Sequence, residues 1–175
     1  MIPSGFSLRP ARLVDAEAIS RVHVISWRET YRGIIDQPHL DGRTVEDRTE
    51  MWRGVLSQLP PNRVFLVVED EGREVVGFAY GGPARDPAHG RAGELYAMYL
   101  LKKCQGAGVG RALFEAFWEG LKAAGIGDFY AMVLQGNPSR GFYIKMGGRS
   151  CGFSEGTIRG RRAARRFAEE KFEWA

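Results

Sequence analysis

Three glycines at alternate positions mark the segment Gln105–Gly110, which reads QGAGVG. Glycine adopts positive φ readily and lets a bulky group approach the backbone without meeting a Cβ atom. The residues that follow have a helical apolar pattern, and a helix begins with unpaired N–H groups and a partial positive charge. Together with Arg111, this turn predicts a cradle for phosphate groups. A flexible strand-to-helix connection, with glycines for tight packing, is an equally good interpretation of the turn alone.

Two other phosphate-binding motifs do not fit this turn. The dinucleotide fingerprint G-x-G-x-x-G has two residues between its last two glycines, whereas one residue separates Gly108 from Gly110. A P-loop requires Gly-Lys followed by Ser or Thr, and the turn does not contain that sequence. If the turn binds phosphate, it does so in another way.

The residues on either side of the turn predict the elements that position it. Glu94–Leu101 is apolar or aromatic on both alternating faces, which is typical of a strand near the middle of a sheet. From Val109 onward, apolar residues recur at helical spacing, and Gly125 is placed to end that helix. A buried strand, a glycine turn and an amphipathic helix therefore follow one another.

A second distinctive block, NPSRGFYIKMGG, lies downstream at Asn137–Gly148. Considered together with this block, the turn resembles the Q/R-x-x-G-x-G/A signature of the GCN5-related N-acetyltransferases, the GNAT family. The later block resembles that family's N…FYxKxGG segment. Leu8–Ala11 followed by Asp15 and Ala16 is similar to the family's opening strand and first helix, so the resemblance covers nearly the whole chain.

The resemblance implies an acetyl-CoA-dependent N-acetyltransferase that acts on a primary amine of a small molecule or peptide by direct attack in a ternary complex. Its pyrophosphate-binding residues would be Gln105, Gly106, Ala107, Gly108, Val109, Gly110 and Arg111. The backbone of Met98, Tyr99 and Leu100 would pair with the pantetheine arm and stabilise the oxyanion. Asn137 would contact the same arm, although it stands one residue nearer to Tyr143 than is usual in the family.

Acyl transfer also needs groups that move protons. A lysine-like amine has a pKa of about 10.4, so a base must remove a proton from it at neutral pH, directly or through water. Glu94, at the start of the central strand, is the candidate base, and Glu69 is a second possibility. The resemblance makes Tyr143 the acid for the leaving thiolate. A solvated carboxylate at a strand end and a core tyrosine are the alternatives for Glu94 and Tyr143.

The resemblance places the acceptor site beside the first helix. Trp27 and Tyr31 are therefore substrate-side candidates, although their helical spacing is equally typical of core residues. Lys102 stands where the family often has a proline before the glycine turn.

Hydrophobic periodicity predicts α/β architecture, and the chain length suits a single domain over residues 1–175, which the resemblance makes a GNAT-type domain. The resemblance adds the fold: a mixed, mostly antiparallel twisted sheet of about seven strands with helices on both faces, the acyl-CoA N-acyltransferase fold. The pattern predicts strands at Ser7–Leu13, Val64–Val68, Glu74–Tyr80, Glu94–Leu101, Asp128–Leu134, Arg149–Ile158 and Phe167–Trp174. Asp15 and Thr44 are expected to cap two helices, Gly33–Gly42 to form a loop, and Pro138 to open a short helix.

Bulk composition favours a cytoplasmic protein. The chain has 175 residues, a formal net charge of +4 and no apolar run long enough to span a membrane or to act as a signal peptide. Its three histidines and two cysteines are not at ligand spacing, so no metal is expected. A homodimer is possible by analogy with the family.

Arg159–Arg166 is strongly basic but is not interleaved with aromatic residues, which favours a solvated hairpin loop over a nucleic-acid site. A role for this cluster toward the anionic cofactor stays open. Two alternatives to an enzyme follow from the same sequence: a non-catalytic acyl-CoA sensor, and a nucleic-acid-binding protein.

Overall fold

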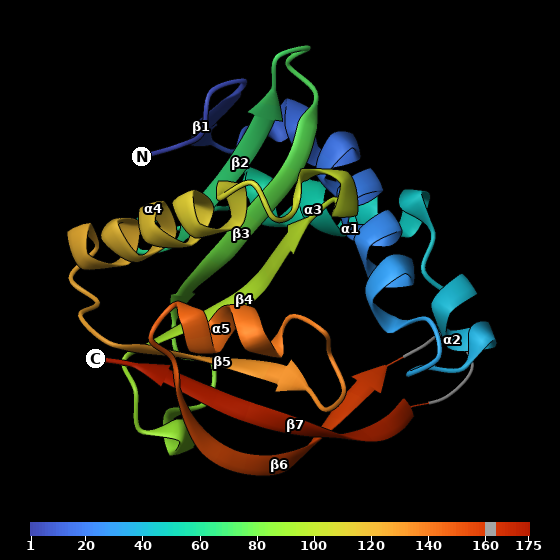
Figure 1. The fold of residues 1–175 in the computed structure, drawn as a ribbon, viewed down its shortest axis with the longest axis vertical. Coiled ribbons are helices and arrows are strands. Elements are labelled where there is room, and N and C mark those ends of the chain that lie inside the picture. The colour runs from blue at the N-terminus through green and yellow to red at the C-terminus, as the bar shows by residue number, and fades with distance from the viewer. Residues whose placement is uncertain (160–163) are drawn as a thin grey trace.

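The computed structural model describes residues 1–159 and 164–175, and one seven-stranded sheet runs through them (Figure 1). The strands are ordered β1-β2-β3-β4-β5-β7-β6, and every neighbouring pair is antiparallel except β4 and β5. Their bounds are β1 Phe6–Pro10, β2 Val64–Asp70, β3 Val75–Pro83, β4 Gly93–Leu100, β5 Phe129–Leu134, β6 Arg149–Arg159 and β7 Ala164–Trp174. The predicted mixed sheet with a central β4 is confirmed.

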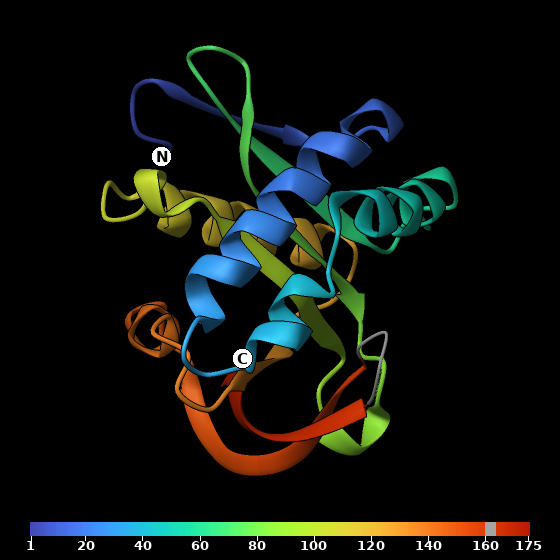
Figure 2. The same cartoon turned by 90° about the vertical axis from the view of Figure 1, so that its right-hand side faces the viewer.

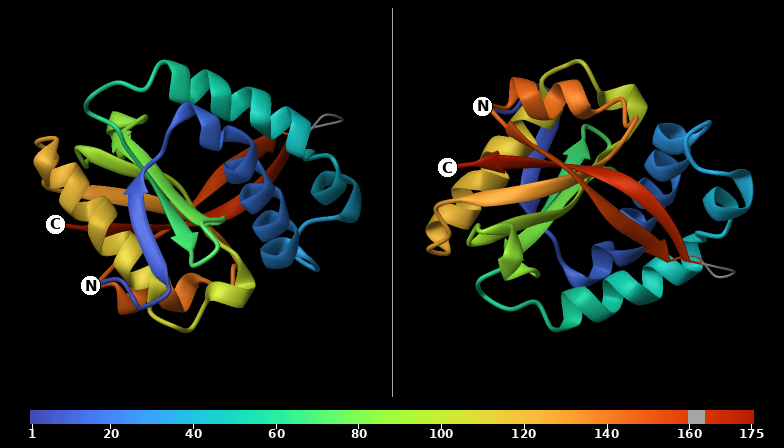
Figure 3. Two further views of the ribbon diagram at one scale, coloured as in Figure 1. Left: turned by 90° about the horizontal axis from the view of Figure 1, so that it is seen from above. Right: turned by 90° about the horizontal axis from the view of Figure 1, so that it is seen from below.

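Helices cover both faces of the sheet, as Figures 1 and 3 show. The α-helices are α1 Ala16–Tyr31, α2 Gln37–Asp41, α3 Val45–Ser57, α4 Val109–Ala123 and α5 Arg140–Lys145, and three short 3-10 helices lie at Leu13–Asp15, Pro87–His89 and Lys102–Cys104. Helix α4 packs on one face over a core that also takes in side chains of α5, while α1 and α3 pack on the other face. The predicted arrangement of helices on both faces is therefore also confirmed.

Helix ends follow the expected chemistry at two places and depart from it at a third. Thr44 caps α3, because its Oγ1 accepts a hydrogen bond from the Asp47 N–H at 3.2 Å. Gly125 follows α4 with a φ of +81° and closes it. Asp15 stands at the N-cap of α1, but its carboxylate does not cap that helix. The carboxylate accepts instead from the Arg9 guanidinium and the Arg12 N–H, both at 2.7 Å.

The expected loop at Gly33–Gly42 contains the short helix α2, so that expectation was wrong. Pro38 favours a loop as a helix breaker, but it stands in the first turn of α2, where its fixed φ suits a helix and its missing N–H costs nothing. Leu40 is buried in a cluster that contains Trp27 and Tyr31, and this tertiary packing stabilises so short a helix.

Element ends also differ elsewhere from those expected. The first strand stops at Pro10, and Leu13 already belongs to a 3-10 helix. Strand β3 continues to Pro83, beyond the expected end at Tyr80. Pro138 precedes α5, whose first residue is Arg140, instead of opening it.

A β-bulge in β4 changes which side chains share a face. The pairing with β3 passes from Gly81–Leu95 to Tyr80–Ala97, so Tyr96 is the extra residue. Simple alternation predicted that Met98 shares a face with Tyr96. Instead, Met98 packs with Leu95 on the α4 side, while Tyr96 and Ala97 pack toward α1. The bulge thus places two consecutive residues, Tyr96 and Ala97, on the same face and reverses the alternation beyond them.

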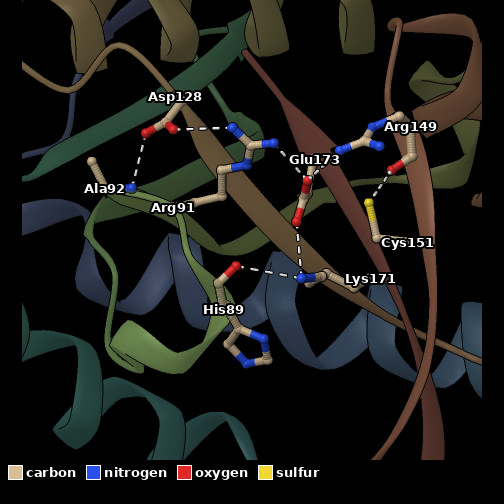
Figure 4. A network of polar contacts seen from close by, with 8 residues as sticks. All are labelled: His89, Arg91, Ala92, Asp128, Arg149, Cys151, Lys171 and Glu173. Atoms are coloured by element: carbon tan, nitrogen blue, oxygen red, sulfur yellow. Dashed lines mark hydrogen bonds and ion pairs between the residues drawn. The ribbon is translucent and has the colours of Figure 1, made fainter.

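A network of charged side chains joins the two halves of the sheet where β4 meets β5 (Figure 4). Arg91 binds Asp128 at 3.2 Å and Glu173 at 2.7 Å. The Glu173 carboxylate also binds Lys171 at 2.8 Å and Arg149 at 3.0 Å. The segment before β4, the start of β5 and both closing strands are therefore tied together at one point.

Two other expectations bear on the molecule as a whole. The basic cluster Arg159–Arg166 includes residues 160–163 and so lies in part outside the described residues. Among the helices that the structure describes, none has the length and apolar character needed to cross a bilayer.

Candidate active site

The parallel strands at the centre of the sheet separate to form a gap. Strand β4 pairs with β5 at Gly93–Phe129 and Glu94–Tyr130, and the register ends there. Beyond that point the strands diverge (Figure 1). A cavity of about 90 Å³ lies between them, lined by Leu95–Leu100 on one side and by Ala131–Val133 on the other. We call it the inner cavity. Because β4 has no strand partner on this edge, its backbone can pair with an extended ligand.

The glycine turn has the geometry expected of a phosphate cradle. Gly106 and Gly108 have φ values of +81° and +85°, a region that other residues rarely adopt. Gly108 is the N-cap of α4, and its carbonyl accepts the first helical bond, from the Ala112 N–H at 3.1 Å. Within the described residues, no N–H group from Gly106 to Arg111 donates a hydrogen bond to another element. These amides are available to an anion at the positive end of a helix.

A larger cavity of about 570 Å³ lies in front of the turn, and we call it the outer cavity. Seven of the residues predicted to bind the cofactor line it: Met98, Leu100, Gln105, Gly106, Gly108, Gly110 and Arg111. Val109 does not, because its side chain is buried in the core beneath α4. Ala107 is exposed beside the cavity without lining it.

The charges around the outer cavity suit a polyanion. Lys102, Arg111 and Lys145 line it, against a single acidic residue, Glu29. Of the four, only Arg111 is among the predicted cofactor-binding residues. Lys102 is a departure from the family pattern, and Lys145 belongs to the second block. The free amides, the positive-φ glycines and these cations together fit a diphosphate-containing ligand such as coenzyme A.

Tyr143 lies where the two cavities meet, because it is one of the residues that line both, together with Thr30, Met98, Leu100, Gln105 and Ser139. Its ring stacks on Phe172 with centroids 5.9 Å apart, which holds the side chain in place. Burial raises the pKa of Tyr143 well above its ordinary value, so the phenol keeps its proton at any physiological pH. Within the described part of the chain, its hydroxyl makes no hydrogen bond and is free to donate one.

Asn137 lines the inner cavity but is absent from the lining of the outer one. Its Nδ2 donates a hydrogen bond to the Tyr31 hydroxyl at 3.1 Å, and its Oδ1 accepts one from the Ser139 N–H at 2.8 Å. The side chain therefore connects the turn after β5 to α1. It can contact only a ligand that extends into the inner cavity.

Comparison with known proteins decides the family. The model of the GNAT acetyltransferase domain matches residues 61–147. The uncharacterized N-acetyltransferase YuaI of Bacillus subtilis is 37% identical over 137 residues, 78% of this chain and 76% of that protein. The chain belongs to the GNAT family. It is therefore an N-acetyltransferase by family, as the two sequence blocks predicted.

Solved structures have the same fold. The PaiA N-acetyltransferase of Thermoplasma acidophilum, in complex with coenzyme A, aligns with a TM-score of 0.70 at 21% identity, covering 94% of this chain and 97% of its own. The phosphinothricin acetyltransferase of Sinorhizobium meliloti, in complex with acetyl-CoA, aligns at 0.72 and 21% identity, covering 97% and 88%. Both confirm the GNAT fold.

The two candidate bases in this GNAT chain are held in ion pairs. Both carboxylate oxygens of Glu94 accept hydrogen bonds from the Arg85 guanidinium, and the Arg85 N–H donates another at 3.0 Å. Burial raises the pKa of Glu94, but the bonds to Arg85 outweigh it and hold the pKa below its usual value. Glu69 is likewise buried and accepts from the Arg9 Nε at 2.9 Å. Neither Glu94 nor Glu69 lines the inner or the outer cavity.

One of the two acceptor-side residues predicted on α1 lines the inner cavity of this GNAT chain, and two further lining residues of α1 were not predicted from the sequence. Tyr31 lines the inner cavity, while Trp27 is buried behind it with ring centroids 4.4 Å apart. Ser26 and Thr30 also line this cavity. The buried Oγ of Ser26 has no hydrogen-bond partner among the described residues. The sequence did contain a signal for Ser26 and Thr30: they are polar residues at helical spacing on a stripe of the first helix that otherwise faces the core.

Proposed function

We propose that the chain transfers an acetyl group from acetyl-CoA to a primary amine within a ternary complex. One observation supports this most strongly: Tyr143 joins an outer cavity with free amides and cations to an inner cavity with polar walls. The outer cavity suits the diphosphate, and the unpaired edge of β4 suits the amides of a pantetheine arm. When bound, acetyl-CoA supplies an acetyl group activated as a thioester.

The residues of the chain have separate tasks in this proposal. The amides of Gly106–Arg111 and the side chains of Lys102 and Lys145 hold the diphosphate. Backbone N–H groups in Met98–Leu100 orient the arm and stabilise charge on the carbonyl oxygen. Tyr143 donates its proton to the leaving thiolate. Since a thiol has a pKa of about 8.5, this donation assists the reaction without being indispensable.

The proton of the acceptor amine needs a different route from the one that the sequence suggested. Glu94 can act as a base only if its ion pair with Arg85 opens, because both of its oxygens are engaged. We infer that the amine loses its proton to water in the inner cavity, where hydroxyl groups of Ser26, Thr30 and Tyr31 can hold that water.

Release of free CoA thiol tests the proposal. Wild-type protein and acetyl-CoA are mixed with a panel of primary amines, and thiol is measured against a mixture without amine. We expect amine-dependent release with at least one class of amine. A non-catalytic sensor would bind acetyl-CoA in calorimetry and release no thiol with any member of the panel.

A further inference from the structure

Two arginines stand on the α1 side of the sheet without a carboxylate partner. Arg43 follows α2, and Arg48 lies in the first turns of α3. Neither guanidinium forms an ion pair with any described residue. Residues 157–165, whose side chains are not described, contain no aspartate or glutamate that could supply one. Two other partly buried arginines, Arg9 and Arg91, bind carboxylates, whereas Arg63 donates to the Tyr80 hydroxyl.

Arg43 is held in place by aromatic rings. Its Cζ lies 3.5 Å from the centroid of the Trp27 ring, a cation–π contact. Its Nη1 is 3.4 Å from the Nε2 of His23. Burial, followed by the charges of Arg43 and Arg48, lowers the pKa of His23 to about 3, so this ring is neutral and cannot offset the charge of a guanidinium. These contacts orient Arg43 but do not neutralise it.

The second arginine, Arg48, adds another positive charge that no carboxylate among the described residues offsets. The Nε of Arg48 is buried and has no hydrogen-bond partner among the described residues, and its Nη1 reaches only the Met51 sulfur at 3.4 Å. Burial lowers the pKa of Arg43, which shows that its charge is poorly solvated. The charge of Arg48 also contributes to lowering the pKa of Arg43. Two neighbouring cations with this environment attract an anion.

This pair of arginines adjoins the proposed reaction site. Tyr31 and Tyr99 line the inner cavity. Trp27, which Arg43 covers, packs on Tyr31 with ring centroids 4.4 Å apart. His23, which Arg43 also contacts, stacks on Tyr99 with ring centroids 4.8 Å apart. The segment after α2 runs beside the C-terminal part of α1, as Figure 2 shows. The Arg28 guanidinium donates to the Arg43 carbonyl at 3.4 Å and fixes this segment to α1. Neither Arg43 nor Arg48 lines the inner cavity itself, so both lie behind the rings of its α1 wall, and the oxyanion of an acceptor must extend past these rings to reach Arg43.

We propose that the acceptor is an amine that also carries an oxyanion, such as a carboxylate or phosphonate, and that Arg43, assisted by Arg48, binds this oxyanion. The inference rests on the proposed function, and it names the substrate class of that site. A planar guanidinium binds a carboxylate or phosphonate through two parallel hydrogen bonds. The anion would offset the charge that the chain itself leaves unpaired.

Matched pairs of acceptors test the proposal. Each pair contains an amino acid and the amine that lacks its carboxylate, for example phenylalanine with phenethylamine, and an aminoalkylphosphonate series is added. Thiol release is measured for the wild type, Arg43→Gln and Arg43→Lys. Arg53→Gln serves as the control, because Arg53 is an exposed arginine of α3 and the substitution removes the same charge.

We expect the wild type to prefer the anionic member of a pair, and Arg43→Gln to reduce kcat/KM for that member by about 10- to 100-fold. Activity on the uncharged partner should change little in the same variant. Arg43→Lys should retain part of the preference, and Arg53→Gln all of it. Equal use of both members by the wild type, or a preference that persists in Arg43→Gln, would overturn the proposal.

A binding measurement decides the question if no member of the panel is acetylated. Methylphosphonate is titrated into CoA-saturated protein while tryptophan fluorescence is recorded, because Trp27 lies beneath Arg43. We expect saturable binding that is at least tenfold weaker in Arg43→Gln than in Arg53→Gln. Identical curves, or no binding, would refute the anion site. Protein that binds acetyl-CoA and methylphosphonate but releases no thiol would instead refute the transfer proposal alone.

Discussion

In the proposed mechanism the Tyr143 hydroxyl is free to donate a proton, whereas the two candidate carboxylates are engaged in ion pairs. Tyr143 lines both cavities and makes no hydrogen bond within the described residues, whereas Glu94 is fully engaged by Arg85. A phenol with a raised pKa remains protonated and can donate, while a carboxylate in a bidentate ion pair is not available to accept a proton.

Replacement of Tyr143 by phenylalanine tests the donor directly. We expect Tyr143→Phe to lower kcat by about 10²- to 10⁴-fold, the usual contribution of a positioned acid. The dissociation constant for acetyl-CoA should change little, because the diphosphate is held elsewhere. Tyr80→Phe is the control, since that buried tyrosine lines neither cavity and its hydroxyl accepts from Arg63. Unchanged turnover in Tyr143→Phe across the pH range would remove this residue from the mechanism.

Replacement of Glu94 by glutamine tests the inference that water accepts the amine proton. Because the pKa of Glu94 lies below its ordinary value, its protonation cannot produce an acidic limb near neutral pH. We expect the pH profile of kcat/KM to follow the acceptor amine in both proteins. We also expect turnover in Glu94→Gln to fall by less than about tenfold, whereas loss of a true base costs about 10²- to 10⁴-fold. A loss of that size, with a stable fold, would restore Glu94 as the base.

At the scale of elements, the site depends on how a glycine turn joins β4 to α4. Both features of the turn that matter for phosphate binding are local: positive φ at Gly106 and Gly108, and the unpaired amides at the start of α4. Neither feature needs a long-range contact. A change at either glycine should therefore affect ligand binding more than stability.

Gly108→Ala forces a Cβ atom onto a residue with a φ of +85°, at a cost of about 1–2 kcal/mol or a rearranged turn. We expect the affinity for CoA to fall about tenfold or more in this variant, measured by calorimetry. Gly54→Ala is the matched control, because this glycine lies in α3 and an added methyl group would meet open space there. The control should bind CoA normally and should be slightly more stable, since alanine favours a helix. Equal CoA affinity in both variants would contradict the cradle.

Local features of the site could be predicted from the sequence. The turn at Gln105–Gly110, the helix after it and the block around Tyr143 are each contained in a short continuous segment. Thr44 and Gly125 likewise act within one helical turn of their own positions. The sequence also supplied the mixed sheet in outline, through the family resemblance.

Features that depend on distant residues could not be predicted. The bulge at Tyr96 reverses the facing of Met98, and only the register with β3 reveals it. The partner of Glu94 is an arginine in the connection before β4, and alternation along a strand carries no information about it. The absence of a described carboxylate partner for Arg43 is a property of the whole fold, because it depends on where every carboxylate lies.

At the scale of the whole molecule, the inner cavity exists because the two halves of the sheet meet at one point and diverge from it. Glu173 lies at that point and binds Arg91, Arg149 and Lys171 (Figure 4). The hydrogen bond from Lys171, then the bond from Arg91, lower the pKa of Glu173 to about 2 against the cost of burial. The negative charge of Glu173 thus stabilises the point where β4 meets β5, which we call the joint.

The depressed pKa of Glu173 predicts an acid-sensitive joint. A carboxylate whose pKa is lower in the folded than in the unfolded state stabilises the fold above pH 4.5 and loses that contribution as the pH falls toward 2. The difference corresponds to at most about 3 kcal/mol at neutral pH. We expect Glu173→Gln to lower Tm by about 5–10 °C at pH 7, and the difference from wild type to shrink progressively below pH 4.5.

Glu119→Gln is the control for the acid series, since its exposed ion pair with Lys122 contributes little to stability. Thermal unfolding of the three proteins between pH 2 and pH 8 should separate the two glutamates. A constant difference between Glu173→Gln and the wild type across this range would show that the charge of Glu173 is not what stabilises the joint.

The central claim is that the backbone of Gln105–Gly110 holds the diphosphate of acetyl-CoA. Isothermal titration calorimetry of CoA into the wild type and into Gly108→Ala tests it most directly. We predict stoichiometric binding to the wild type that weakens with salt and weakens further in the variant. Absence of binding to the folded wild type, or identical affinity in the two proteins, would contradict it.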